Sequence, residues 1–410
     1  MTSLLARQSA RRFRWYVCGL LFFATTINYV DRQVLGLLKP VLERQLGWNE
    51  ADYGWIVFAF QLAYALMMPL AGRLMDWAGT RLGYAVAVTL WSLAAMSHAL
   101  ARNALGFGLA RFGLGLSESA NFPAAIRTVA DWFPQRERAL ATGIFNSGAN
   151  IGAIVAPLVV PFLALHYGWR SAFIATGAAG LAWVFLWGGL LRGDRGHPPE
   201  PPPDEQPEAP PLRSLLSNRV TWAFIAGKFL TDPAWWFYLF WLPGFLNRVY
   251  GLDLAHLGLP IVVVYQASAV GSIGGGWIPS ALLKRGWAPN RAREAAMLVC
   301  ALAVTLVMLV AVAGGHMWLA VALVGVATAA HQGWSANLFT LASDLFPRGA
   351  VASVVGLGGL AGAVGGMLIA PMVGYWLDWS HGAYGPLFVI AGSIYLVAFG
   401  IIHWLVSGKR

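Results

Sequence analysis

The chain has 410 residues, of which 58% are hydrophobic and 11% are charged, and its formal net charge is +10. A soluble domain carries about 25% charged residues, so this composition excludes an ordinary soluble protein and indicates a polytopic membrane protein. The positive charge does not indicate nucleic-acid binding, because the basic residues fall in short segments between hydrophobic runs and do not form one basic face.

Twelve hydrophobic runs are long enough to cross a membrane, since a transmembrane helix needs about 20 mostly apolar residues. They cover approximately residues 15–38, 53–72, 82–101, 104–128, 139–162, 172–191, 220–246, 259–283, 295–313, 316–340, 350–374 and 385–406. Runs this long and continuous predict helices, because the strands of membrane β-barrels are shorter and alternate in polarity. We therefore predict an all-α membrane protein of twelve transmembrane helices.

Basic residues gather before the first run and after runs 2, 4, 6, 8 and 10, whereas the intervening loops hold few. By the positive-inside rule, we expect both termini on the cytoplasmic side. The first run is long enough to span and lacks a small-residue cleavage site, so we expect no cleavable signal.

Residues 193–219 separate six runs from six. This segment is rich in proline and acidic residues, which predicts an extended cytoplasmic linker between an N-terminal half, residues 1–192, and a C-terminal half, residues 220–410. The halves are weakly similar to each other: ADWFP at 130–134 matches SDLFP at 343–347. Repeated halves are a common construction of transporters.

Runs 5 and 11 carry glycines at helical spacing, namely Gly143, Gly148 and Gly152, then Gly356, Gly359, Gly362 and Gly366. Small residues let helices approach closely in lipid, where no hydrophobic force drives their association. The pattern fits static close packing and also a helix that moves against its neighbours.

Six ionisable residues lie well inside the predicted spans, where a charge costs roughly 3 kcal/mol. They are Asp31 and Arg32 in the first span, Arg111 and Glu118 in the fourth, and Lys228 and Asp232 in the seventh. The first and fourth helices run in opposite directions, so Arg111 and Asp31 lie at about the same depth and we expect them to pair. We also expect a contact of Arg32 toward Glu118, which lies nearer the midplane of the membrane. Lys228 and Asp232, at i and i+4, can neutralise each other.

Two interpretations of these residues remain open. Buried ion pairs can be retained without any role beyond neutralisation, whereas ionisable residues inside a membrane often mark a transport pathway. An arginine in a cavity can bind a substrate carboxylate through two parallel hydrogen bonds. Burial disfavours the charged form of a carboxylate, so a buried acid can also carry a proton.

The motifs resemble those of the major facilitator superfamily across essentially the whole chain. The stretch GRLMDWAGTR is similar to the signature loop between the second and third helices of that family, through Gly72, Asp76, Gly79 and Arg81. Trp77 departs from the pattern, since a basic residue is usual there, and a plain surface turn is the alternative interpretation. The resemblance implies two six-helix halves and transport by alternating access.

Within that superfamily the chain resembles the anion:cation symporters, and especially bacterial hexuronate transporters. The likeness is carried by NYVDR at 28–32, RFGLGLSE at 111–118, KFLTDPAWWFY at 228–238 and HQGWSAN at 331–337. It implies proton-coupled symport of a hexuronate, glucuronate or galacturonate, across the bacterial inner membrane. It also implies a monomer that needs no cofactor or metal and is not an enzyme.

The same resemblance implies roles for single residues. Asp31 and Glu118 match protonation sites, Arg111 matches the partner of the first acid, and Arg32 matches the arginine that holds the substrate carboxylate. The substrate-binding positions that it suggests beside Arg32 are Tyr29, Tyr64, Glu118, Asn150, Lys228, His331, Gln332, Trp334 and Asn337.

The eleventh span departs from the aldonate carriers, since Gly358 and Gly359 stand where those carriers tend to place an asparagine. His331, Gln332 and Asn337 in the tenth span can supply the missing hydrogen bonds. Trp235, Trp236 and Trp334 offer aromatic faces for a sugar ring, but among 20 tryptophans many must serve packing or anchor the helices at the membrane surface.

Other functions fit the sequence less well. A different organic anion, such as an aldonate, an aromatic acid or a monocarboxylate, suits the same architecture. Export of cationic drugs is disfavoured by Arg32, Arg111 and Lys228. An intramembrane enzyme has little support, since the sequence contains no glycine-rich phosphate loop, no H-E-x-x-H and no G-x-S-x-G motif.

Overall fold

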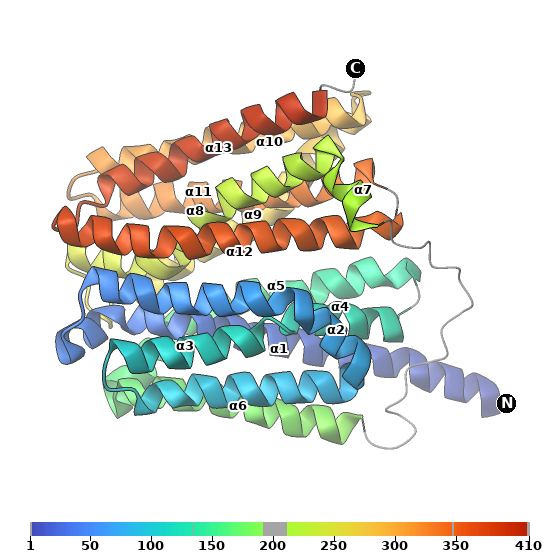
Figure 1. The fold of residues 1–410 in the computed structure, drawn as a ribbon, viewed down its shortest axis with the longest axis horizontal. Coiled ribbons are helices and arrows are strands. Elements are labelled where there is room, and N and C mark those ends of the chain that lie inside the picture. Colours follow the sequence, from blue (N-terminus) through green and yellow to red (C-terminus); the bar gives the residue numbers. More distant parts are fainter. Residues whose placement is uncertain (1, 134, 192–210, 347, 408–410) are drawn as a thin grey trace. The chain divides into compact units, whose positions relative to one another are not determined.

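The structure is a computed structural model, and it describes residues 2–133, 135–191, 211–346 and 348–407. Within these ranges every regular element is a helix (Figure 1), which confirms the predicted all-α class. The chain divides into two compact units. Unit 1 comprises Met1–Trp48 and Ala59–Glu205, and unit 2 comprises Asn49–Phe58 and Gln206–Arg410. This division differs from the expected halves, because residues 49–58 group with the second unit.

Most of the first six predicted spans lie in unit 1. Its elements are α1 (Thr2–Leu46), α2 (Glu50–Ser97, whose first residues belong to unit 2), the 3-10 helix η1 (His98–Leu100), α3 (Ala104–Glu118), α4 (Asn121–Trp132), α5 (Gln135–Tyr167) and α6 (Trp169–Leu190). The long α2 holds two predicted spans. Its backbone leaves the helical conformation at Gly79, with φ 72° and ψ 155°, a region that glycine adopts without steric cost.

Unit 2 holds the last six predicted spans. Its elements are α7 (Leu212–Leu216), α8 (Arg219–Tyr250), α9 (Gly258–Lys284), α10 (Pro289–Thr305), the 3-10 helix η3 (Leu306–Val312), α11 (Met317–Leu345), α12 (Arg348–Trp379) and α13 (Gly385–Ser407). Apart from single end residues and the two residues between α3 and α4, each of the twelve predicted runs therefore lies in one helix or in two consecutive helices.

The helices differ in how well their composition suits lipid. Within the described residues, eight helical segments are long and apolar enough to cross a membrane, and they lie in α2 (twice), α5, α6, α9, α10 with η3, α12 and α13. The predicted spans outside this group are α1, α3 with α4, α8 and α11. These helices carry the ionisable and polar motifs. Such residues lower the mean hydropathy of a helix, which explains why these four spans are less apolar than the others.

The predicted linker forms more regular structure than expected at its C-terminal end. Residues 192–210 lie outside the described residues. The expectation of an extended chain is wrong for the segment LRSLL, which forms α7 and packs on α8 and α12. This segment follows the last proline of the linker, and Leu215 is 4% exposed, so burial of leucine stabilises this short helix.

Aromatic residues form much of the core of unit 1. Tyr84 of α2 contacts the rings of Trp91, Trp183 and Trp187, and the last two stack with centroids 5.0 Å apart. The indole N–H of Trp183 donates to the carbonyl oxygen of Leu20 at 2.7 Å. These tryptophans therefore serve packing, as expected for part of the set.

Several of the helical glycines stand at close helix contacts. A methyl group at Gly148 of α5 would lie 2.4 Å from the carbonyl oxygen of Phe22 in α1, and one at Gly152 would lie 2.5 Å from that of Thr26. In unit 2, a methyl group at Gly275 of α9 would lie 2.1 Å from the Cα atom of Gly333 in α11. Only a glycine permits these distances, so the glycines at these positions allow the close approach of their helices.

Candidate functional site

A cluster of buried charged residues in unit 1 forms where the fourth predicted span is interrupted. This span consists of two helices, because α3 ends at Glu118 and α4 begins at Asn121. Pro123 lies in the first turn of α4, where its missing N–H breaks no helical hydrogen bond, whereas a helix continuing from α3 would need that N–H. Glu118 is therefore the last residue of a helix that stops inside the unit, and it is 0% exposed.

Arg32 of α1 forms an ion pair with Glu118. Its Nε atom lies 2.8 Å from Oε2 of the carboxylate, and the two side chains are 4% and 0% exposed. The expected contact of Arg32 with Glu118 is thus present. Breaking a buried pair by removing one partner typically costs 3–5 kcal/mol, because it leaves a buried charge without compensation.

Aromatic rings enclose the guanidinium of Arg32. Its central carbon lies 4.9 Å from the ring centre of Tyr64, 5.1 Å from that of Tyr29 and 5.5 Å from that of Phe60. A ring face attracts a cation electrostatically, and this attraction is stronger where water is excluded. Tyr29 and Tyr64 were expected here, whereas Phe60 was missed. Its spacing of four residues from Tyr64 on α2 is the signal that could have indicated it.

Arg111 lies near Asp31, but its described hydrogen bond is to the backbone. The Nη2 atom of Arg111 donates to the carbonyl oxygen of Arg32 at 3.0 Å, and no described hydrogen bond joins its guanidinium to the Asp31 carboxylate. Asp31 is nevertheless buried, at 2% exposure, and Arg111, Glu118 and Thr176 are among its polar neighbours. The two residues therefore lie near each other, as their matching depths predict, and no described hydrogen bond joins their side chains.

Asn150 lies on α5 and is half-buried. The flanking glycines, Gly148 and Gly152, bring α5 against α1 beside Thr26 and Tyr29. None of the described hydrogen bonds joins the Asn150 side chain to the Arg32 cluster.

The signature-loop residues surround the break in α2. The surroundings of Gly72 and the side chain of Asp76 lie outside what the structure describes, while Gly79 provides the change of direction. The carbonyl oxygen of Arg81 accepts a hydrogen bond of 3.0 Å from the Trp187 indole. The hydroxyl of the neighbouring Thr80 donates to Asp131 at 3.3 Å, the acid of the ADWFP motif.

A second cluster lies in unit 2, on α8. Lys228 and Asp232 form an ion pair, with Nζ 2.8 Å from Oδ2, and their side chains are 9% and 15% exposed. The ammonium group also lies 4.9 Å from the ring centre of Phe339 in α11. The predicted neutralisation between residues i and i+4 is thus present.

His331 of α11 lies beside this cluster and contacts the rings of Tyr395 and Trp235. Its Nδ1 atom lies 2.5 Å from the hydroxyl of Tyr395 in α13, and that hydroxyl can donate to the carbonyl oxygen of Thr231 at 3.3 Å. The imidazole stacks on Trp235 with centroids 5.1 Å apart and a 10° interplanar angle. Tyr395 was missed, although a tyrosine in the middle of an apolar run is a usable signal.

The other candidates on α11 differ in their surroundings. Trp334 is fully buried and packs against Tyr395. The amide of Asn337 donates to the carbonyl oxygens of Gly275 and Gly333, both at 2.8 Å, so it ties α9 to α11. Gln332 is half-buried.

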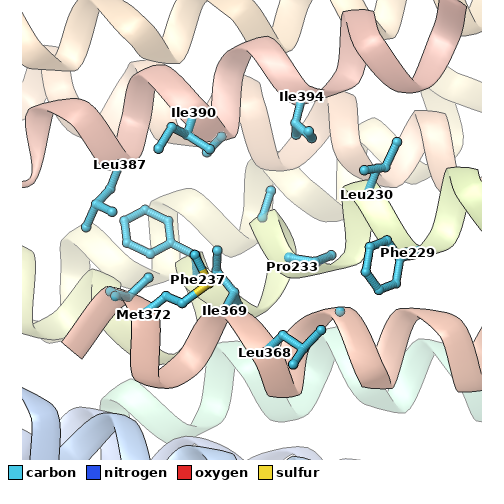
Figure 2. Close-up of a pocket in the computed structure, with 14 residues that line it drawn as sticks. Phe229, Leu230, Pro233, Phe237, Leu368, Ile369, Met372, Leu387, Ile390 and Ile394 are labelled. Atoms are coloured by element: carbon cyan, nitrogen blue, oxygen red, sulfur yellow. The ribbon is translucent and has the colours of Figure 1, made fainter. Parts of the chain in front are cut away.

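The opposite side of α8 is apolar. A cavity of about 280 Å³ lies among α8, α12 and α13, and its lining includes Phe229, Pro233 and Phe237 but neither Lys228 nor Asp232. Figure 2 shows these aromatic and aliphatic side chains gathered around one space. Polar and apolar residues thus occupy different faces of α8.

Comparisons with known proteins agree with this architecture. The model of the Major Facilitator Superfamily matches residues 21–370. A hexuronate transporter of Escherichia coli K12 is 30% identical over 97% of this chain and 94% of its own length. A galacturonate transporter of Dickeya chrysanthemi is 31% identical over 65% of this chain and 81% of its own.

The fold itself has solved counterparts. The crystal structure of a bacterial homologue of the human lysosomal transporter Spinster matches with a TM-score of 0.73 and 20% identity, over 96% of this chain and 95% of that one. The family match covers most of the sequence and the hexuronate transporter of Escherichia coli matches 97% of it, so this chain is a multi-pass membrane transporter, not an enzyme, and belongs to the major facilitator superfamily.

Proposed function

We propose that this protein is a secondary active transporter that carries a hexuronate, glucuronate or galacturonate, together with protons by alternating access. The observation that carries the proposal is the buried pair of Arg32 with Glu118, enclosed by Tyr29 and Tyr64. A guanidinium is the natural partner of a carboxylate substrate. The names of the hexuronate and galacturonate transporters among its relatives support the same substrate class.

The coupling in this proposal follows from charge. While Glu118 is ionised, its carboxylate pairs with the Nε–H group of Arg32 at 2.8 Å. A substrate carboxylate would then bring a second negative charge beside that of Glu118. Protonation of Glu118 removes that charge and leaves the guanidinium available to the substrate. Binding of the anion and of the proton then favour each other, which is the requirement for symport.

We assign Asp31 as a second proton-carrying group, with Arg111 holding the α1 backbone beside it through the Arg32 carbonyl. In unit 2, Lys228, His331 and Gln332 are the proposed partners of the sugar hydroxyls, and Trp235 offers a ring face. Trp334 and Asn337 contribute to the proposed site through their neighbours, since Trp334 packs on Tyr395 and Asn337 hydrogen-bonds to α9.

The remaining parts of the proposal concern organisation. We propose that the transporter works as a monomer in the bacterial inner membrane, with both termini cytoplasmic and with residues 1–192 and 220–410 as its two halves. The alternative substrate class is an aldonate, since a D-galactonate transporter of Escherichia coli is 26% identical over 94% of this chain.

The test is transport by purified protein in proteoliposomes. We expect uptake of labelled hexuronate to rise with external acidity and to exceed that of aldonates and aromatic acids. Glu118→Gln, which mimics the protonated acid, should abolish accumulation driven by a pH gradient and retain exchange of internal for external substrate. Loss of both activities in a folded Glu118→Gln protein would contradict the coupling role, and a preference for an aldonate would contradict the substrate.

A further inference from the structure

The structure points to a selectivity device in unit 2. We propose that Asp232 restricts transport to sugar acids with a single carboxylate, because its charge already neutralises Lys228. This inference rests on the proposed function and adds to it a rule about charge: the monocarboxylate uronate is accepted, and the dicarboxylate aldarate of the same sugar is rejected.

The charge inventory of unit 2 is the first argument. Among the described residues of this unit, Lys228 is the only lysine or arginine that is buried. Its Nζ atom lies 2.8 Å from Oδ2 of Asp232. His331 and Tyr395 are the other titratable groups beside the pair, from α11 and α13, and they hydrogen-bond to each other. The cluster therefore offers no surplus positive charge to a second carboxylate.

The second argument is how tightly the pair is held. A methyl group at Gly362 of α12 would lie 2.0 Å from Oδ2 of Asp232, and one at Gly358 would lie 3.1 Å from Cγ of Lys228. Gly362 thus makes room for the Asp232 carboxylate, and Gly358 makes room for the ring of Phe224, 2.1 Å from such a methyl group, and for the Lys228 side chain beside it. The ring of Phe339 lies on a further side of the ammonium group, so the pair is closely fitted between α11 and α12.

The third argument is the contrast with unit 1. Arg32 and Glu118 come from different helices, α1 and α3, and protonation of Glu118 separates them in the proposed cycle. Lys228 and Asp232 lie one turn apart on α8, where an intact helix keeps the two side chains within reach of each other. A paired lysine and aspartate still provide N–H donors and carboxylate acceptors for hydroxyl groups. The cluster therefore suits the hydroxylated end of a sugar acid and repels a second anion.

The experiment measures competition in proteoliposomes that take up a labelled uronate. Unlabelled galacturonate and galactarate, which share their stereochemistry, compete in the wild type, in Asp232→Asn and in the double variant Lys228→Met/Asp232→Asn. The readout is the ratio of the two inhibition constants, which does not depend on how much protein is active. Asp253→Asn is the matched control, since it removes an acid of the same unit whose side chain is 63% exposed.

We expect the wild type and the Asp253 control to favour the uronate by about tenfold or more. Asp232→Asn should shift the ratio toward the aldarate by about tenfold, because Lys228 then carries a surplus charge. The neutral double variant should return to the wild-type ratio. An unchanged ratio in Asp232→Asn would overturn the inference, and so would equal competition by the two acids in the wild type. In either case, uptake of uronate by the wild type would still support the proposed function. Absence of any sugar-acid uptake by the wild type would overturn both.

Discussion

The contact between α5 and α1 gives a sharp prediction, because Gly152 lies against the residue that packs on Arg32. A methyl group at this position would lie 2.5 Å from the carbonyl oxygen of Thr26 and 2.8 Å from Cβ of Tyr29, where ordinary contact begins at 3.4 Å. The two helices must therefore separate by about 0.9 Å at Thr26. Overpacking of this kind typically costs about 1–3 kcal/mol.

The displacement also acts on the site. The Tyr29 ring centre lies 5.1 Å from the Arg32 guanidinium, and such a contact contributes about 0.5–2 kcal/mol. Its loss corresponds to a change in affinity of roughly twofold to thirtyfold. We expect Gly152→Ala to lower the thermal unfolding temperature in detergent and to raise the KM for uronate.

Gly143→Ala is the matched control, since Gly143 lies on the same helix and a methyl group there meets nothing within 4 Å. Replacing an exposed helical glycine by alanine typically stabilises a protein by about 0.4–1 kcal/mol. If Gly152→Ala unfolded at the same temperature as Gly143→Ala and kept the wild-type KM, the close-contact argument would be refuted.

Two further predictions concern unit 2. Gly362→Ala should displace the Asp232 side chain from its position beside α12, and so lower both the stability of the protein and its selectivity for monocarboxylates. Gly356→Ala is the control and should change neither quantity, because a methyl group there meets nothing within 4 Å. Thermal unfolding measures the stability and uptake competition measures the selectivity. Tyr395→Phe should cost about 1–3 kcal/mol of stability, because it removes the hydroxyl that lies 2.5 Å from the buried His331. It should also raise the KM for uronate, and wild-type values of both quantities would show that this hydrogen bond has no such effect.

Local sequence patterns determined the helices and one of the ion pairs. The hydrophobic runs located all twelve spans, because the length and polarity of a segment decide whether it can cross lipid. The pair of Lys228 with Asp232 followed from their spacing on one helix. The expectation that Arg32 contacts Glu118 came from pairing the opposite charges inside the first and fourth spans, since a charge inside a membrane is costly.

Only the tertiary structure decided which side chains surround these charges. Depth gives the height of a residue along a helix but not the direction of its side chain around the axis, so it could not predict that Arg111 donates to the backbone carbonyl oxygen of Arg32. Phe60 and Tyr395 became part of the clusters because α2 and α13 turn those residues inward. Helix rotation results from packing, such as the glycine contacts of α5 and α12, and packing depends on every neighbouring helix at once.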